Sequence, residues 1–140
     1  MTDCLFCAIA AGDKPGFMVH SDDEVAAFLD VRPVFKGHVL VVPRAHVATL
    51  ADLPAAAVQP YFLRVQAVAA AVEEGLQAGG TFVAMNNRVS QSVPHLHTHV
   101  VPRVKGDGLR GFFWPRTKYA DDAEARSYAS SVRKAMRNPS

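Results

Sequence analysis

Three histidines stand at alternate positions in the segment P-H-L-H-T-H-V-V-P-R, where they are His95, His97 and His99. The chain contains 6 histidines, so this short segment holds half of them. A neutral imidazole is a good nucleophile and a good leaving group. A neighbouring imidazole, when protonated, can bind a phosphate oxygen, and imidazole is also a common metal ligand. The cluster therefore indicates either chemistry at phosphorus or metal binding.

Three interpretations of the cluster differ in what they require. Alternate residues of a strand point to one face, so a polar strand face is the simplest interpretation, but Leu96, Val100 and Val101 predict a buried strand. One ion held by all three rings is disfavoured, because His95 and His99 would lie roughly 13 Å apart along a straight strand. Zinc holds an imidazole nitrogen at about 2 Å, so it could bind neighbouring members only. We favour nucleophilic catalysis at phosphorus.

The residues just upstream support this interpretation. Ser90, Gln91 and Ser92 precede the histidines, and their amides and hydroxyls could cradle an anionic oxygen. A nucleophilic imidazole also needs a hydrogen bond on its other nitrogen to fix the tautomer.

Composition limits the class of protein. The chain has 140 residues, 49% of them hydrophobic and 20% charged, which predicts one folded domain with a real core. The net charge of +2 is too small to indicate a nucleic-acid or membrane partner by itself. We find no apolar run approaching the roughly 18 residues of a membrane span and no signal peptide, so we expect a cytoplasmic protein. Disulfides are then unlikely, and the two cysteines need another explanation.

The pattern of strands and helices predicts an α+β fold with a mostly antiparallel sheet, because strands and helices are grouped instead of strictly alternating. Pro60 is expected in the first turns of the long helix or at the end of a short leading piece, and Gly79-Gly80 should close that helix. The expected strands are 17–21, 25–30, 38–43, 81–86 and 96–101, and the expected helices are 4–11, 55–78 and 121–136.

Several motifs together resemble a known family. The triad reads His-φ-His-φ-His-φ-φ with φ apolar, except for Thr98, and the chain also contains A-F-L-D-V-R-P and K-G-H-V-L-V-V-P-R-A-H. In this order and spacing they resemble the histidine-triad (HIT) nucleotide hydrolases and transferases, from about Cys4 to Arg103. The short C-L-F-C start and the C-terminal helix are more similar to the bacterial Hint-like branch than to the Fhit branch. The resemblance implies a single HIT-like domain over 1–140, with about 104–140 as a family-variable C-terminal extension.

The resemblance also implies roles. His97 would attack the α-phosphorus, His99 would hold the phosphate, and His38 would lie near the catalytic centre. Ser90 stands where the family usually has glycine. From residue type alone, Asp30 could equally be a turn residue, and the apolar positions could be plain core. The residues implied to bind the nucleotide or its phosphate are Asp30 at the ribose, Asn86, Asn87, Gln91 and Ser92, with Leu5, Phe6, Ile9, Phe28 and Val31 around the base.

The pair Cys4 and Cys7 is weak evidence when taken alone. It could be a redox pair, two buried small side chains, or half of a metal site. The resemblance implies that His46 and His95 complete a structural Zn²⁺ site with the two thiolates. We expect no catalytic metal and no organic cofactor, since fixed donors would meet the negative charge of the phosphate.

The expected function is hydrolysis of a purine nucleoside monophosphate from its leaving group, of phosphoramidate type, through a nucleotidyl-histidine. The alternatives are a diadenosine polyphosphate hydrolase, a nucleotidyl transferase, and a nucleotide-binding or interaction module with little catalysis. The resemblance implies a homodimer joined through the long helix and strand 81–86. From charge and composition we expect neither a nucleic-acid nor a membrane partner. The aromatic run Phe112-Phe113-Trp114 is interpreted as packing on the sheet or as a lid.

Overall fold

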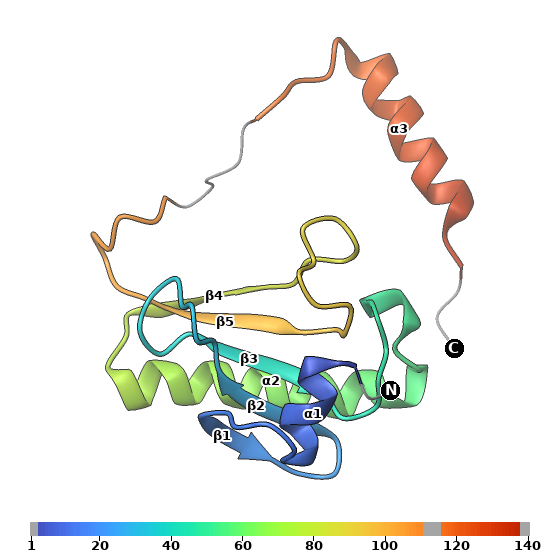
Figure 1. The fold of residues 1–140 in the computed structure, drawn as a ribbon. Coiled ribbons are helices and arrows are strands. Elements are labelled where there is room, and N and C mark those ends of the chain that lie inside the picture. The colour runs from blue at the N-terminus through green and yellow to red at the C-terminus, as the bar shows by residue number, and fades with distance from the viewer. Residues whose placement is uncertain (1–2, 111–115, 138–140) are drawn as a thin grey trace. The chain divides into compact units, whose positions relative to one another are not determined.

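The structure is a computed structural model that describes residues 3–110 and 116–137. The chain falls into two compact units, 1–105 and 106–140. The first unit contains the sheet, the long helix and the histidine cluster (Figure 1). The expected aromatic run Phe112-Phe113-Trp114 lies outside the described residues.

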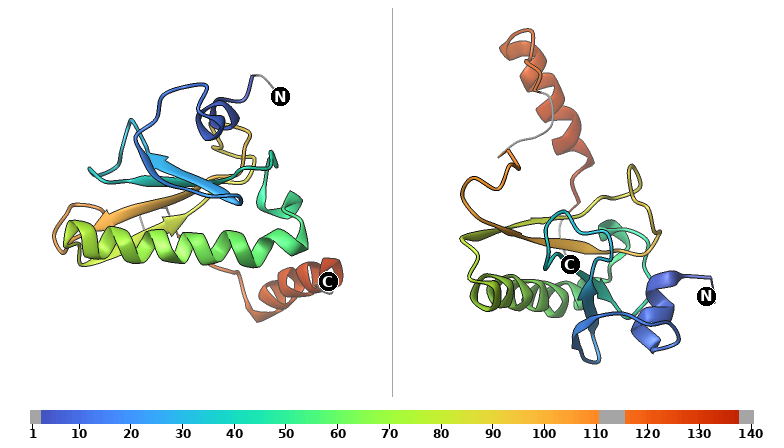
Figure 2. Two further views of the ribbon diagram at one scale, coloured as in Figure 1. Left: turned by 90° about the horizontal axis from the view of Figure 1, so that it is seen from below. Right: turned by 60° about the vertical axis from the view of Figure 1, so that its left-hand side comes forward.

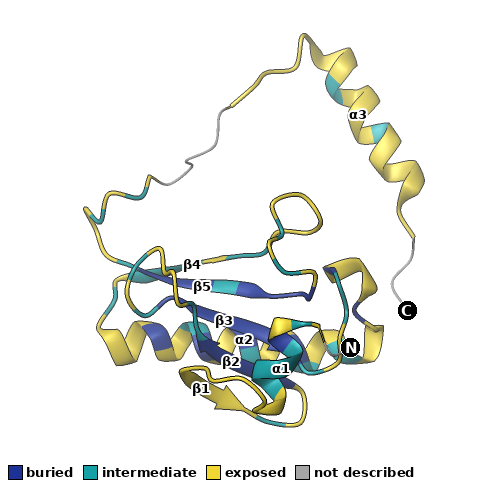
Figure 3. Ribbon diagram, in the orientation of Figure 1, coloured by how far each residue is buried: buried dark blue, intermediate teal, exposed yellow. Residues whose placement is uncertain are grey.

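A five-stranded sheet forms the centre of the first unit. The strands lie in the order β1-β2-β3-β5-β4, and every neighbouring pair is antiparallel. The α+β fold with a mostly antiparallel sheet is therefore confirmed. The central strands β2, β3 and β5 are mostly buried, as Figure 3 shows. The strands are β1 (Met18–Ser21), β2 (Val25–Leu29), β3 (Val39–Pro43), β4 (Gly80–Ala84) and β5 (Thr98–Arg103).

The long helix α2 (Ala55–Leu76) runs along one face of this sheet (Figure 2). Its inward stripe of Tyr61, Val65, Val68 and Val72 is buried, and these side chains join the apolar faces of β2, β3 and β5 in one core. The Tyr61 hydroxyl satisfies its burial by lying 2.8 Å from the Val41 carbonyl oxygen and 2.6 Å from the Thr98 hydroxyl. The short helix α1 (Leu5–Ala11) lies on the other face and buries only Phe6.

Helix α2 begins at Ala55, as expected, and its last residue is Leu76, two residues before the expected Ala78. Pro60 lies inside the helix without breaking it, and the piece that leads into it is a separate 3-10 turn, Leu50–Asp52. The helix ends at Gln77, which adopts the left-handed conformation with φ 52°. The Gln77 amide closes the last turn on carbonyl oxygens within the helix, so Gly79-Gly80 is not needed as the cap, and β4 already begins at Gly80.

The last strand begins two residues later than the expected start at Leu96. β5 begins at Thr98, so His95, Leu96 and His97 precede the strand and His99 lies on it. The first two amides are used elsewhere, because the His95 N–H donates to the Val93 carbonyl and the Leu96 N–H donates to the Val47 carbonyl, each at 2.8 Å. The histidines therefore do not share one strand face, and His95 is free to serve a different site.

In length and composition α2 would suffice to cross a membrane, which the sequence analysis did not expect. The core helix of a soluble protein passes the same test, and α2 places a buried stripe on the sheet while carrying Arg64, Glu73 and Glu74. The packing of this stripe thus accounts for part of its apolar character.

Within its described residues, 106–110 and 116–137, the second unit contains one helix, α3 (Asp122–Ala135). Asp121 caps it by accepting a hydrogen bond from the Glu124 amide at 2.8 Å, and acidic residues in the first turn and basic residues in the last complement the helix dipole. These signals explain why the helix begins and ends close to the expected bounds.

Candidate functional site

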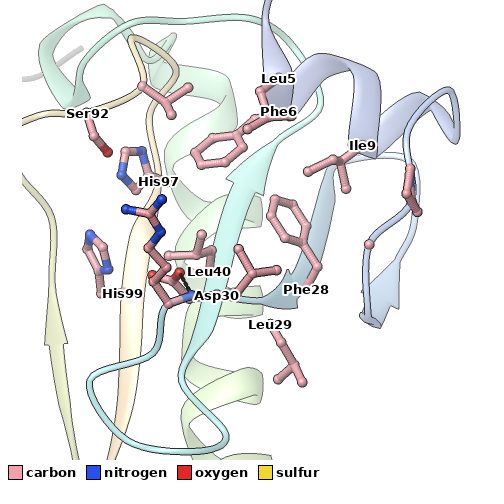
Figure 4. Close-up of a pocket in the computed structure, with 15 residues that line it drawn as sticks. Leu5, Phe6, Ile9, Phe28, Leu29, Asp30, Leu40, Ser92, His97 and His99 are labelled. Atoms are coloured by element: carbon pink, nitrogen blue, oxygen red, sulfur yellow. Dashed lines mark hydrogen bonds between the residues drawn. The ribbon is translucent and has the colours of Figure 1, made fainter.

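A pocket of about 430 Å³ opens in the first unit where α1, the end of β2, β3 and the approach to β5 meet (Figure 4). One part of its lining is apolar and the other carries hydrogen-bonding and charged groups. The apolar residues are Leu5, Phe6, Ile9, Pro15, Gly16, Phe28, Leu29, Val31, Leu40 and Val93, and the polar ones are Asp30, Arg32, Ser92, His97 and His99.

The apolar part is built by close ring packing. The Phe6 ring centroid lies 5.5 Å from that of Phe28 and 5.0 Å from that of His97, both in edge-to-face geometry. Gly16 lets the chain after α1 approach closely, because a Cβ atom there would come within 2.8 Å of the Ile9 side chain. The result is an aromatic and aliphatic wall beside the histidines, suited to a flat nucleobase.

The middle histidine of the triad is held in one tautomer. His97 is 4% exposed, and its Nδ1 lies 2.7 Å from the His95 carbonyl oxygen. A carbonyl can only accept, so this hydrogen bond places the proton on Nδ1 and leaves the lone pair on Nε2. His97 thus has the oriented nitrogen that nucleophilic catalysis requires.

His38 and His99 form a second hydrogen-bonded pair. The Val34 amide donates to His38 Nδ1 at 3.1 Å, which places the His38 proton on Nε2, 2.9 Å from His99 Nδ1. His99 accepts there, and its own proton is on Nε2. Burial lowers the pKa of His38, and burial together with the neighbouring His97 and His38 rings lowers the pKa of His99 to about 4. At neutral pH, then, His99 of the free protein offers a hydrogen bond from an uncharged ring.

Asp30 follows β2 and lines the pocket. Its Oδ1 accepts the Arg32 amide at 2.9 Å, and its Oδ2 lies 3.7 Å from His38 Nε2. The turn role and a binding role are therefore compatible, because one oxygen shapes the turn while the carboxylate still faces the pocket. Arg32 is a pocket residue that the sequence alone does not indicate, since a cation beside a turn proline is usually a solvated surface residue.

The segment before the triad contributes one pocket residue, Ser92. Gln91 does not line the pocket: its Nε2 donates to the Ala48 carbonyl at 2.6 Å, and its Oε1 accepts the Arg88 amide at 2.8 Å. Gln91 therefore fixes the loop that carries Ser92. Ser90 adopts φ 61°, a left-handed conformation, which explains why glycine suits this position.

The two asparagines are also placed beside the pocket lining and not within it. Asn86 donates from Nδ2 to the Ser90 carbonyl at 3.2 Å, and Asn87 accepts the Leu50 amide on Oδ1 at 2.8 Å. Both side chains brace the same loop. His20 lies on β1 away from the pocket, where its Nε2 is 2.6 Å from Asp22 Oδ2.

The four predicted metal ligands converge. The ligand atoms of Cys4, Cys7, His46 and His95 all lie within 4.8 Å of one another. His95 Nδ1 is 3.3 Å from Cys4 Sγ, 3.4 Å from Cys7 Sγ and 3.2 Å from His46 Nδ1. Ligands of a tetrahedral zinc ion lie roughly 3.3–3.6 Å apart when one is nitrogen, so the donor set fits zinc. The Nε2 of His95 is 2.7 Å from the Pro43 carbonyl, which orients Nδ1 toward the thiols.

His95 and helix α1 connect the metal cluster with the pocket. His95 contributes its side chain to the cluster and its carbonyl to His97. Cys4 caps α1 by accepting the Cys7 amide at 3.4 Å, and Phe6, which lies between the two cysteines in the sequence, forms the pocket wall. The cluster and the pocket are therefore joined by two short connections, the His95 carbonyl and helix α1.

Comparison with known proteins agrees with this geometry. The family model for the HIT domain matches residues 11–106. A crystal structure of a HIT family member from Bacillus subtilis is 35% identical, with a TM-score of 0.85 over 97% of this chain and 99% of that chain. A zinc-bound histidine triad family protein from Mycobacterium smegmatis is 34% identical, with a TM-score of 0.73 over 96% and 99%. The adenylylsulfatase HINT3 of Arabidopsis thaliana is 30% identical over 94% of this chain and 68% of that protein. The chain therefore belongs to the HIT domain family, which includes hydrolases such as that adenylylsulfatase.

Proposed function

We propose that the protein hydrolyses a purine nucleoside monophosphate from its leaving group, of phosphoramidate type, through a covalent nucleotidyl-His97. The observation that carries this proposal is the oriented His97 ring. Its Nδ1 proton is bound to a backbone carbonyl, and its free Nε2 belongs to a pocket that also contains His99 and Ser92.

In the first step the His97 Nε2 lone pair attacks the α-phosphorus. A phosphorus–nitrogen bond to His97 forms while the bond to the leaving group breaks, and an amine leaving group departs with a proton taken from solvent. His97 becomes cationic, and the His95 carbonyl, 2.7 Å from Nδ1, stabilises that charge. His99 Nε2–H and the Ser92 hydroxyl donate to the phosphoryl oxygens.

In the second step water attacks the same phosphorus and loses a proton. The bond to His97 breaks, the nucleoside monophosphate is released, and the ring returns to its neutral form with the proton on Nδ1. The apolar wall of Phe6, Ile9 and Phe28 holds the base, and Asp30 accepts hydrogen bonds from the ribose hydroxyls.

Hydrolysis of adenylyl sulfate is a second candidate, favoured by the similarity to the adenylylsulfatase of Arabidopsis thaliana. Both candidates use the same nucleophile and differ in the departing group. Dinucleoside polyphosphates, and transfer of the nucleotide to a phosphate instead of water, are the remaining alternatives that a substrate panel separates.

The experiment compares kcat/KM for adenosine phosphoramidates, adenylyl sulfate and diadenosine polyphosphates in the wild type, in His97→Ala and in the control His20→Gln. His97→Ala should lose at least roughly a thousandfold in kcat, about 4 kcal/mol of barrier, yet still bind AMP. Rapid quench with substrate labelled at the α-phosphorus should trap the label on His97. Turnover by His97→Ala within tenfold of the wild type, or label on another residue, would contradict the proposal.

We also propose that Cys4, Cys7, His46 and His95 hold one structural Zn²⁺. The donor set has two thiols and two imidazoles at tetrahedral spacing, and burial lowers the pKa of His95, which keeps that ring in the neutral form that binds metal. Similarity to the zinc-bound protein of Mycobacterium smegmatis supports the same assignment.

The proposed assembly is a cytoplasmic homodimer joined through α2 and the edge strand β4. The outward face of α2 exposes Val58, Phe62 and Leu63, and Val83 is 44% exposed on β4, whose outer edge is unpaired in the described sheet. An apolar helix face beside a free strand edge suits a second copy of the chain. Light scattering should give twice the chain mass, and Leu63→Glu should lower it.

A further inference from the structure

The proposed reaction assigns no role to the positive charge of Arg32. Arg32 lies two residues after Asp30 and lines the pocket together with His97 and His99. Its backbone amide is bound to Asp30 Oδ1, which fixes the place of the residue in the turn. Within residues 3–110 and 116–137, no hydrogen bond or ion pair engages its guanidinium.

Two other arginines of the first unit have guanidinium groups that other parts of the protein engage. Arg64 pairs with Asp22 at 2.9 Å, and Arg44 donates to the Ala10 carbonyl at 2.9 Å. These two cations tie elements together and are unavailable to a ligand. Arg32 has no such structural task in the described residues, so its charge remains available at the pocket.

The charges around the pocket make that cation significant. Burial lowers the pKa values of His38 and His99, so both rings are neutral near pH 7, and Asp30 adds a negative charge. Among the described lining residues, Arg32 is the one permanent cation. The α-phosphate has neutral donors in Ser92 and His99, whereas a second negative group on the substrate would have Arg32 alone.

The place of Arg32 points to the leaving group. His97 is buried, with 4% of its surface exposed, whereas Arg32 is exposed at the rim. In an in-line displacement at phosphorus the departing group lies opposite the attacking nitrogen. Because His97 is buried and Arg32 is exposed in the same pocket, a group opposite His97 would extend toward the exposed side, where Arg32 lies.

We infer that Arg32 selects substrates whose leaving group carries an anionic oxygen, as in a sulfate, a phosphate or the carboxylate of an amino acid. This inference rests on the proposed attack by His97 and specifies the substrate class for that same site. A guanidinium matches two oxygens of such a group in a planar, bidentate arrangement, which a neutral side chain cannot do.

Binding tests the inference without turnover. In the His97→Ala background, dissociation constants are measured for ADP, adenylyl sulfate and adenosine 5′-methyl phosphate, which has a neutral outer group. Adding Arg32→Gln should weaken the first two about tenfold and the methyl ester less than twofold, since a bidentate charged pair contributes more than a single exposed ion pair. The substitution keeps the backbone amide that donates to Asp30, so the turn is preserved.

The matched control is Lys36→Gln, which removes the same charge from the same loop at a residue that does not line the pocket. It should change none of the three affinities by more than twofold. Arg32→Lys should recover part of the preference, because it retains the charge but not the planar fork.

Turnover measurements on proteins that retain His97 show whether Arg32 recognises a sulfate, a carboxylate or both in the leaving group. Arg32→Gln should lower kcat/KM about tenfold for adenylyl sulfate, and also for the adenosine phosphoramidate of alanine, but not for that of alanine methyl ester. Equal losses on all substrates would assign Arg32 to the α-phosphate, and no loss on any would remove it from recognition; either result overturns the inference. If the wild type hydrolyses none of them, the proposed function fails, while the binding series still decides the role of Arg32. If none of the ligands binds, both ideas fail.

Discussion

Replacing both thiols in the variant Cys4→Ser/Cys7→Ser should remove the metal and loosen the wall of the nucleotide pocket. Two of the four proposed ligands are lost, and the remaining His46 and His95 cannot close a tetrahedral site. Helix α1 has 7 residues and buries only Phe6, so it depends on its anchors more than on its own helical stability.

The size of the effect follows from linkage and from burial. A metal present at 1,000 times its dissociation constant stabilises the folded state by about 4 kcal/mol. For a chain of this size that corresponds to a fall in Tm of roughly 8–16 °C. If α1 detaches, exposure of the Phe6 side chain adds about 1.5–3 kcal/mol, although the hydrogen bond from Arg44 to the Ala10 carbonyl still retains the end of the helix.

Elemental analysis of protein purified without added metal gives the zinc content, and thermal unfolding gives Tm. We expect about one zinc per chain in the wild type, none in the double variant, and a weaker AMP affinity in that variant because Phe6 lines the pocket. The control His20→Gln removes an exposed histidine outside the cluster and should retain zinc. A zinc-free wild type with the same Tm as the double variant would refute the reasoning and make the cysteines a packing feature.

Three further perturbations test other parts of the structure. Asp30→Asn should weaken ribonucleotides more than 2′-deoxyribonucleotides, since each hydrogen bond to a charged group contributes about 1.5–3 kcal/mol; equal weakening in a binding titration would move Asp30 away from the ribose. Tyr61→Phe should lower the free energy of unfolding in urea by about 1–3 kcal/mol, because it leaves Val41 and Thr98 without the buried hydroxyl; a change below about 0.5 kcal/mol would contradict this. NMR of the imidazole should show His99 titrating near its pKa of about 4, below the unfolded value of 6.5, so the stability from its neutral ring is complete above about pH 6.5 and is lost as pH falls toward 4; a midpoint above 6.5 would reverse the sign.

Much of the fold could be predicted because its signals are local. The β-branched run before Pro43 and the capping aspartate before α3 determine their elements through propensity and hydrogen bonds between near neighbours. The start of β5 could not be found in this way. It depends on the hydrogen bond from Leu96 to Val47, which joins residues far apart in the sequence.

The same contrast between local and long-range signals applies to the residues of the site. The spacing of the triad and of Cys4 and Cys7 is visible in the sequence, and family resemblance adds His46. The place of Gln91 could not be predicted in this way. The Gln91 side-chain amide donates to the Ala48 carbonyl, which is far away in the sequence, and Gln91 does not line the pocket. Arg32 was missed because its importance depends on which other charges surround the pocket, and that is a property of the folded chain.

The division of His95 between two sites has an evolutionary consequence. Its imidazole belongs to the metal cluster, but the atom that orients His97 is a main-chain oxygen, which a residue of any type supplies. A lineage descended from this protein could therefore lose the metal by drift at the cysteines and at position 95 while inheriting an intact nucleophile, provided that new apolar contacts hold α1 in place. Descendants with unrelated residues at these four positions would still be expected to retain His97.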